Sequence, residues 1–283
     1  GQGHETAFAQ LVHEFLGVPF DRIRLVQGDT DTVSFGRGTY GSRSITVGGS
    51  AIKDAADQII TKARKMAGHM LEAAETDIEF KEGTFRVAGT DKKIGIQDIA
   101  RASYMPIGWP AQFGIGLEAA GTFSPTSTNW PNGCHVCEVE VDPETGKVEL
   151  VKFSAIDDSG IIVNPLLFEG QIHGGLAMGI GQALLEDVAF DPKTGQMLSG
   201  SFMDYCMPRA DDLPTFHTDD IVVPCTTNPL GVKGAGESGT VGATPAVIHA
   251  ILNALRPLGV TDMPLPATPL NVWRAIKSAK RAA

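Results

Sequence analysis

The first periodic segment of the chain predicts a helix, because apolar residues recur at helical spacing over residues 5–16 (ETAFAQLVHEFL). The pattern stops at Gly17, a common helix exit. Residues 22–26 (RIRLV) alternate between basic and apolar side chains and predict a short strand. After a long polar, glycine-rich loop, a second and longer amphipathic helix is expected over residues 49–74.

The middle of the chain predicts two pairs of strands separated by an irregular segment. Residues 78–87 indicate two short strands around a turn at 81–83. Residues 101–132 are rich in proline and glycine and lack periodicity, so we expect a boundary or crossover there. Residues 134–158 then alternate on both sides of a Pro-Glu-Thr-Gly turn, which indicates a β-hairpin.

In the last part of the chain, helices are expected over residues 168–185, 245–256 and 269–282, and a short strand over residues 221–223. For the helix at 245–256, Thr244 is the expected N-cap and Pro245 the first helical residue. Because helices and strands follow in mixed order without a βαβ rhythm, the sequence favours the α+β class. We expect two mixed α+β subdomains, residues 1–130 and residues 131–283.

Composition restricts the partners. The 283 residues are 42% apolar and 20% charged, which suits a globular protein with a sizeable core. The net charge of −10 disfavours nucleic acid and acidic membrane surfaces as partners. Neither a membrane-spanning run nor a signal-peptide pattern occurs, so we expect a cytoplasmic protein. Since residue 1 is a glycine, we also expect a piece of a longer polypeptide, or a processed or split subunit.

The cysteines and the paired aspartates are weak candidates for metal ligands. Cys134 and Cys137 have C-x-x-C spacing, but they open a predicted strand, where residues three apart point to opposite faces. The sequence therefore favours a structural role for the cysteines. The pair Asp157-Asp158 suggests a divalent-metal enzyme only weakly, because no partner ligand lies at helical spacing.

Residues 234–239 (GAGESG) have the G-x-G-x-x-G spelling of a dinucleotide-binding loop. Such a loop needs a hydrophobic strand directly before its first glycine, but residues 226–233 (TTNPLGVK) indicate a loop there. A nucleotide-binding dehydrogenase therefore stays the weaker alternative. Glu237 stands among small residues that leave room over its carboxylate, and a desolvated carboxylate is a competent proton acceptor near neutral pH.

Several motifs in order resemble the molybdopterin-binding large subunit of the molybdenum hydroxylases, the family of xanthine oxidase, aldehyde oxidoreductases and aerobic carbon monoxide dehydrogenase. These motifs are GQGHET at 1–6, GTYGSRS at 38–44, EGQIHGG at 169–175 and KGAGES at 233–238. The pattern is most similar to the carbon monoxide dehydrogenase-like branch. The resemblance covers essentially the whole chain and corresponds to the second half of the family's molybdenum subunit.

The resemblance implies a mechanism. In the family a molybdenum ion, held by a pterin dithiolene and by no protein side chain, carries a hydroxyl group. A glutamate deprotonates that hydroxyl, which attacks an electron-poor carbon while hydride passes to a sulfido ligand. Glu237 matches this catalytic base. The loop wrapping the metal and pterin is matched by Lys233, Gly234, Ala235 and Gly236.

Further cofactor-binding residues follow from the same resemblance. The N-terminal loop beside the metal is matched by Gln2, Gly3 and His4. The segment that cradles the pterin and phosphates is matched by Tyr40, Gly41, Ser42, Arg43 and Ser44. Its hydroxyls, amides and one arginine suit an anion. Gln171 matches a glutamine that hydrogen-bonds the pterin. The cytosine-dinucleotide form of the cofactor is expected.

The resemblance also implies partners. The family's first half, with most substrate-selecting loops, is absent from this chain, so it is expected as a partner on the same or a separate chain. None of the cysteines has iron–sulfur spacing, so the family's clusters are expected on another chain. The resemblance implies a small subunit for these clusters and a medium subunit for FAD.

The predicted reaction is molybdenum-dependent hydroxylation of a small aldehyde or N-heteroaromatic compound. The Gly-Ala-Gly before Glu237 favours an organic substrate, because the genuine carbon monoxide enzymes tend to have a valine-alanine pair there. Two alternatives stay open: a fragment of an aerobic carbon monoxide dehydrogenase large subunit, and a non-catalytic cofactor-carrying or assembly subunit.

Overall fold

The computed structural model describes residues 1–33, 35–105 and 107–282, and the chain divides into two compact units. The first unit comprises residues 1–129 and 224–234, and the second comprises residues 130–223 and the chain from 235 onwards. The expected subdomains, 1–130 and 131–283, stay a prediction. The compact units differ from them in one segment, because residues 224–234 belong to the first unit.

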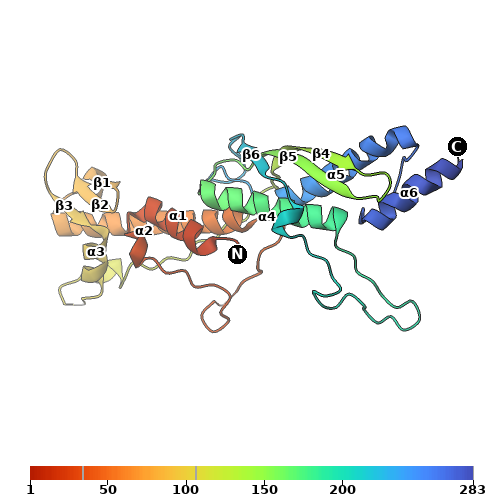
Figure 1. Ribbon diagram of the computed structural model, residues 1–283. Coiled ribbons are helices and arrows are strands. Elements are labelled where there is room, and N and C mark those ends of the chain that lie inside the picture. Colours follow the sequence, from red (N-terminus) through yellow and green to blue (C-terminus); the bar gives the residue numbers. More distant parts are fainter. Residues whose placement is uncertain (34, 106, 283) are drawn as a thin grey trace. The chain divides into compact units, whose positions relative to one another are not determined.

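The first unit is organised around one long helix. Helix α1 (His4–Leu16) contacts α2 (Ser50–Leu71), as Figure 1 shows in red and orange, and both helices were predicted. A π-helical turn, Ser44–Gly49, leads directly into α2. The strand predicted at residues 22–26 was wrong: Phe20–Arg22 forms a 3-10 turn and the following residues are irregular. An alternating pattern alone does not make a strand when no neighbouring strand pairs with it.

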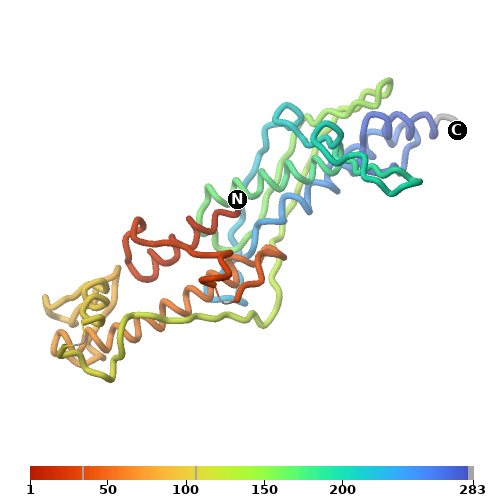
Figure 2. The backbone as a smooth tube through the Cα atoms, turned by 90° about the horizontal axis from the view of Figure 1, so that it is seen from below, coloured from red at the N-terminus to blue at the C-terminus, as the bar shows by residue number. Residues whose placement is uncertain are grey.

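A small antiparallel sheet lies at the C-terminal end of α2 (Figures 1 and 2). Its strands β1 (Ile78–Lys81), β2 (Thr84–Val87) and β3 (Lys93–Gly95) follow in order, and α3 (Ile96–Ser103) comes next. The first two strands confirm the predicted pair around a turn. Met66, Phe85 and Ile99 are fully buried between α2, the sheet and α3, and form the core of this unit.

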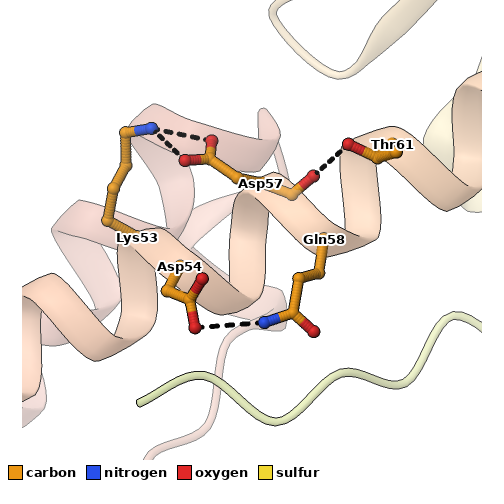
Figure 3. A network of polar contacts seen from close by, with 5 residues as sticks. All are labelled: Lys53, Asp54, Asp57, Gln58 and Thr61. Carbon is orange, nitrogen blue, oxygen red and sulfur yellow. Dashed lines mark hydrogen bonds and ion pairs between the residues drawn. The ribbon is translucent and has the colours of Figure 1, made fainter. Parts of the chain in front are cut away.

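An extended segment that contains Gly121 and Thr122 packs along α2, part of which is drawn in Figure 3. The Oδ2 atom of Asp54 accepts the backbone amide of Thr122 and the side-chain amide of Gln58, both at 3.0 Å. Gly121 permits this close approach, because a Cβ there would stand 2.6 Å from the amide nitrogen of Ala55. Most of the segment predicted as a boundary, residues 101–132, therefore lies within the first unit, which ends at residue 129 in this part of the chain.

The second unit contains a mixed three-stranded sheet. Strands β4 (Asn132–Val141) and β5 (Val148–Asp158) form the predicted hairpin, with a β-bulge between Glu138 and Val139. Strand β6 (Phe216–Asp220) pairs in parallel with β5. The strand predicted at 221–223 was wrong, because pairing follows Phe216, which packs its ring against Phe153 in the core, and ends at Asp220.

Helices α4 (Pro165–Leu184), α5 (Ser238–Leu255) and α6 (Pro269–Ala282) complete the second unit. Helix α5 contacts β4, and α4 contacts both α5 and β6. Their shared core includes the fully buried side chains of Phe153, Leu176, Ile251 and Ile276. Helices and sheets in both units confirm the α+β class. Across the described ranges, no helix combines the length and apolarity that crossing a bilayer requires.

The largest departure from the expected helices is the start of α5. The helix begins at Ser238, with Glu237 as its N-cap residue, instead of at Pro245. Pro245 lies inside the helix, and Thr244 does not cap it. The hydroxyl of Thr244 instead donates to the carbonyl of Gly179 on α4 at 3.0 Å. Packing against α4 thus extends a helix whose local sequence indicates a later start.

Candidate functional site

The N-terminal loop is anchored through His4. Gly3 adopts a left-handed conformation (φ 72°), and its carbonyl accepts the amide of Ala7 at the start of α1. The His4 ring stacks on Phe8 with 5.1 Å between centroids, and its Nδ1 lies 3.1 Å from Oε1 of Gln27. Gln2 is exposed. The loop therefore presents Gln2 from a fixed helix end, while His4 is engaged with its neighbours.

The GTYGSRS segment has an unusual backbone. Gly38, Gly41 and Ser42 all have positive φ values, of 71°, 59° and 50°. Glycine adopts this region readily, but serine rarely does. An added Cβ on Gly38 or Gly41 would meet nothing within 4 Å. The loop is thus held in a sparsely populated shape while its glycines face open space.

Side chains within this segment hold one another. The Arg43 guanidinium lies 3.7 Å from the centroid of the Tyr40 ring, and its Nη2 is 3.4 Å from the carbonyl of Gly38. The hydroxyls of Thr39 and Ser44 lie 2.6 Å apart. Stacking on an aromatic face orients the planar guanidinium and leaves other N–H groups for an acceptor.

The first unit brings three motif segments together around the π-helical turn. A Cβ on Gly48 would stand 2.9 Å from the ring of Phe8, and one on Gly49 would stand 2.8 Å from Leu230. Gly234 is buried against Ser42, whose Cβ would be 2.6 Å from a Cβ on residue 234. The sequence pattern did not reveal this meeting of the N-terminal helix, the GTYGSRS segment and the Lys233-Gly234 end of the KGAGE loop.

Asn228 fixes the chain just before Lys233 and was missed by sequence reasoning. It is buried; its Oδ1 accepts the amide of Val232 at 3.2 Å, and its Nδ2 donates to the carbonyl of the same residue at 2.9 Å. Asn129 also reaches that carbonyl, at 3.4 Å. The available signal was an asparagine before a proline in a glycine-containing turn, a type that bonds its own backbone.

The rest of the loop belongs to the second unit. Ala235 is partly buried, whereas Gly236 and Glu237 are exposed. The carbonyl of Glu237 accepts the amide of Val241 in the first turn of α5, at 3.0 Å. The exposure of Glu237 is compatible with the expected room over its carboxylate, and its role as a base stays a prediction. Next to it, the hydroxyl of Ser238 is buried and has no hydrogen-bond partner among the described residues.

Helices α4 and α5 cross at their glycines. A Cβ on Gly175 would stand 3.0 Å from the Cα of Gly239, and one on Gly239 would stand 2.6 Å from the carbonyl oxygen of Ile172. Gln171 precedes this crossing on α4 and Glu237 precedes it on α5. The crossing therefore places the two predicted site residues on one tightly packed helix pair.

The other metal-ligand candidates have structural surroundings. Cys134 and Cys137 are free thiols on β4; Cys134 is exposed, and Cys137 faces the core. Asp157 pairs with His135, and Asp158 accepts the backbone amides of Gly160 and Val223. Among the described residues, no group of three or more His, Cys, Asp or Glu side chains is placed to hold a metal ion.

Comparison with known proteins gives a consistent picture. The family model described as "Molybdopterin cofactor-binding domain" matches residues 1–214. The chain is 41% identical to the carbon monoxide dehydrogenase large chain of Hydrogenophaga pseudoflava, over 98% of this chain and 34% of that protein. It is 40% identical to the nicotine 6-hydroxylase large subunit of Paenarthrobacter nicotinovorans, with the same coverage of both chains.

Among solved structures, a Cu,Mo-CO dehydrogenase in its carbon monoxide reduced state superposes with a TM-score of 0.91 and 37% identity. That match covers 100% of this chain and 35% of the other. This chain therefore spans about a third of the length of the relatives that it matches, whereas half of the subunit was expected.

Proposed function

Because this chain belongs to the molybdopterin cofactor-binding family of the molybdenum hydroxylases, we propose that it forms part of the molybdenum site of a hydroxylase-type oxidoreductase. Its substrate is a small organic molecule with an electron-poor carbon, an aldehyde or an N-heteroaromatic compound. The observation that carries this proposal is the close packing of Gly234 against Ser42, which joins two motif segments that the sequence separates by nearly two hundred residues.

The residues fit a large anionic cofactor. Arg43 is oriented by Tyr40 and keeps N–H groups for an acceptor, and Lys233 adds a second cation. Gly38 and Gly41 leave room for a ligand to approach the backbone, since an added Cβ there meets nothing. Cations and exposed backbone amides are the groups that recognise phosphate and pterin oxygens.

In this proposal the binding roles fall to the predicted residues. Gln2, Gly3 and His4 border the metal, and Tyr40 to Ser44 cradle the pterin and its phosphates. Gln171 donates to the pterin from α4. The small residues Gly234, Ala235 and Gly236 keep the substrate carbon accessible. When bound, the molybdenum cofactor supplies two-electron redox chemistry.

Glu237 is the proposed base and accepts a proton at a carboxylate oxygen. It stands at the N-terminus of α5, where the helix dipole favours a negative charge. Because Glu237 is exposed in this chain, the proposal requires the remaining parts of the enzyme and the bound cofactor to exclude water from it. A carboxylate transferred in this way from water to a dry site becomes a stronger proton acceptor.

Carbon monoxide oxidation is the alternative that the comparisons support, because carbon monoxide dehydrogenase and nicotine 6-hydroxylase large subunits are about equally similar to the chain. The proposed complex also contains the missing part of the molybdenum subunit, an iron–sulfur small subunit and an FAD medium subunit. Names such as "large chain" and "complex subunit gamma" among the relatives support a multi-subunit enzyme. The cytosine-dinucleotide cofactor and the cytoplasmic location stay predictions.

The test is Glu237→Gln in the purified complex, with Glu149→Gln, an exposed side chain on β5, as the matched control. We expect Glu237→Gln to abolish turnover without lowering bound molybdenum, and the control to leave both unchanged. Turnover is measured with an aldehyde, an N-heteroaromatic compound and carbon monoxide. Turnover that survives Glu237→Gln overturns the assignment of the base. A wild-type complex without molybdenum supports the non-catalytic subunit instead.

A further inference from the structure

The first two turns of α5 have a sequence that does not favour a helix. Residues 238–244 (SGTVGAT) contain two glycines and two threonines, and Pro245 follows. Each glycine costs about 1 kcal/mol relative to alanine in a helix interior, and a proline costs about 3 kcal/mol. Pro245 also lacks the N–H that would bond the carbonyl of Val241. The helical state of this segment therefore depends on contacts with other elements.

One supporting element is α4. The hydroxyls of Thr240 and Thr244 donate to the carbonyls of Gly175 and Gly179, at 3.1 and 3.0 Å. These bonds hold the side of the segment that faces α4. They leave its other side to the sheet, because α5 also packs on β4.

On the sheet, a buried histidine–aspartate pair lies next to the segment. Nε2 of His135 on β4 lies 3.2 and 3.3 Å from the two carboxylate oxygens of Asp157 on β5. Both side chains are about 5% exposed or less. The Phe153 ring lies edge-to-face with the imidazole, with 5.9 Å between the ring centroids. Asp157 thus holds the ring in one orientation, because a buried carboxylate is costly to leave unpaired.

The imidazole of His135 is in close contact with α5 at Gly242. A Cβ on Gly242 would overlap Nδ1 of His135 and would stand 2.7 Å from Cγ of the same ring. Nδ1 is itself buried and has no hydrogen-bond partner among the described residues. Gly242 is five residues after Glu237, so the contact lies about 7.5 Å along the helix axis from that residue. Only glycine lets the helix rest directly on this ring.

We propose that His135 is a positioning residue for Glu237: oriented by Asp157, it supports the helical segment 238–244 at Gly242 and so fixes the carboxylate at the head of α5. This inference rests on the proposed function of Glu237 as base. It assigns His135 no contact with substrate or cofactor. Misplacing a catalytic group by about 1 Å can lower turnover about 100-fold.

The test is a double-mutant cycle in the holoenzyme complex. His135→Ala removes the support, and Gly242→Ala pushes the helix off the ring. In the double variant the new methyl group occupies the space that the imidazole leaves, and alanine also favours the helix. Ile276→Ala, a buried core substitution on α6, is the control for general loss of stability. Turnover per bound molybdenum, KM, and hydrogen exchange of the 238–244 amides are measured for each variant.

We expect each single variant to lower kcat about 10- to 100-fold with little change in KM, and to raise exchange of the 238–244 amides. The double variant should be more active than either single variant. Ile276→Ala should lower thermal stability without this local exchange. The proposal is wrong if Gly242→Ala lowers kcat by the same factor with and without His135. It is also wrong if His135→Ala leaves kcat unchanged while Glu237→Gln abolishes turnover. Turnover that survives Glu237→Gln instead refutes the proposed function, whereas the exchange result reports on His135 independently.

Discussion

Gly234 lies directly against the backbone of Ser42: a Cβ on residue 234 would overlap the Ser42 carbonyl oxygen and would stand 2.6 Å from the Ser42 Cβ. Ser42 itself has a positive φ of 50°. Two segments that resemble cofactor loops therefore fix each other's shape before any ligand binds. The absence of a side chain at residue 234 is a condition of this arrangement.

Gly234→Ala is expected to separate the two loops. The methyl group would meet backbone atoms, which cannot rotate away, and overpacking of this kind costs about 1–3 kcal/mol. The purified complex should lose bound molybdenum and unfold at a lower temperature. Gly36→Ala is the matched control, because among the described residues a Cβ there meets one side-chain atom, at 4.0 Å. Normal molybdenum content in Gly234→Ala would contradict a role for this contact in cofactor binding.

Two Asp-Pro-x-Thr-Gly turns, at 142–146 and 191–195, allow a second matched comparison. Gly146 and Gly195 both have a positive φ, of 76° and 71°, so alanine costs about 1–2 kcal/mol at either position. A Cβ on Gly146 would also stand 2.8 Å from the amide nitrogen of Trp273 on α6, whereas one on Gly195 meets nothing. Gly146→Ala should therefore lower the melting temperature more than Gly195→Ala. Equal shifts would show that α6 yields freely at this contact.

Asp54 should contribute more than the neighbouring Lys53–Asp57 ion pair to holding the extended segment against α2. Asp54→Ala removes the acceptor of the exposed Thr122 amide, a loss of about 0.5–1.5 kcal/mol, and should release the extended segment to proteolysis. Lys53→Ala breaks only the exposed pair with Asp57 (Figure 3), which is worth about 0.3–0.5 kcal/mol. Limited proteolysis of residues 114–123 compares the two variants. Identical cleavage rates would show that Gly121 and its neighbours hold the segment without Asp54.

Burial, with a smaller contribution from Glu138, raises the pKa of the Cys137 thiol from 9.0 to about 11. The folded state therefore binds the proton more tightly than the unfolded state. The contribution to stability is fully present below pH 9 and is lost as the pH rises toward 11. Comparing wild type with Cys137→Ala over pH 8–11, by chemical unfolding, should show a steeper loss in the wild type. The exposed Cys134, replaced by alanine, should leave the slope unchanged.

Elements with strong local signals were predictable from the sequence. The helices α1, α2 and α6 and the β4–β5 hairpin lie close to their expected positions, because periodicity and turn residues agree there. Segment 22–26 alternates but has no strand partner, and β6 ends where 221–223 was expected to begin. In both cases pairing with another strand decided the structure, and a local pattern does not contain that information.

The candidate residues were predicted from ordered motifs, but their supports were not. Asn228 lies outside the ordered motifs, and His135 lies within the C-x-x-C segment, whose spacing says nothing of its contact with Gly242. His135 contacts a segment about a hundred residues away in the sequence, at Gly242. Asn228 acts within a buried turn, through Val232. The small neighbours of Glu237 indicate free space over its exposed carboxylate, but they do not say what fills that space.

The proline inside α5 shows that local sequence preference does not determine the structure of this helix. From residue 238 to 244 the local preference of the sequence and the structure imposed by the fold disagree, which is local frustration in the sense of energy-landscape theory. A sequence optimised for stability alone would place alanine and leucine there. Natural proteins retain such conflicts at functional positions. The residues leading away from Glu237 are therefore shaped for close approach by their neighbours at the expense of helical stability.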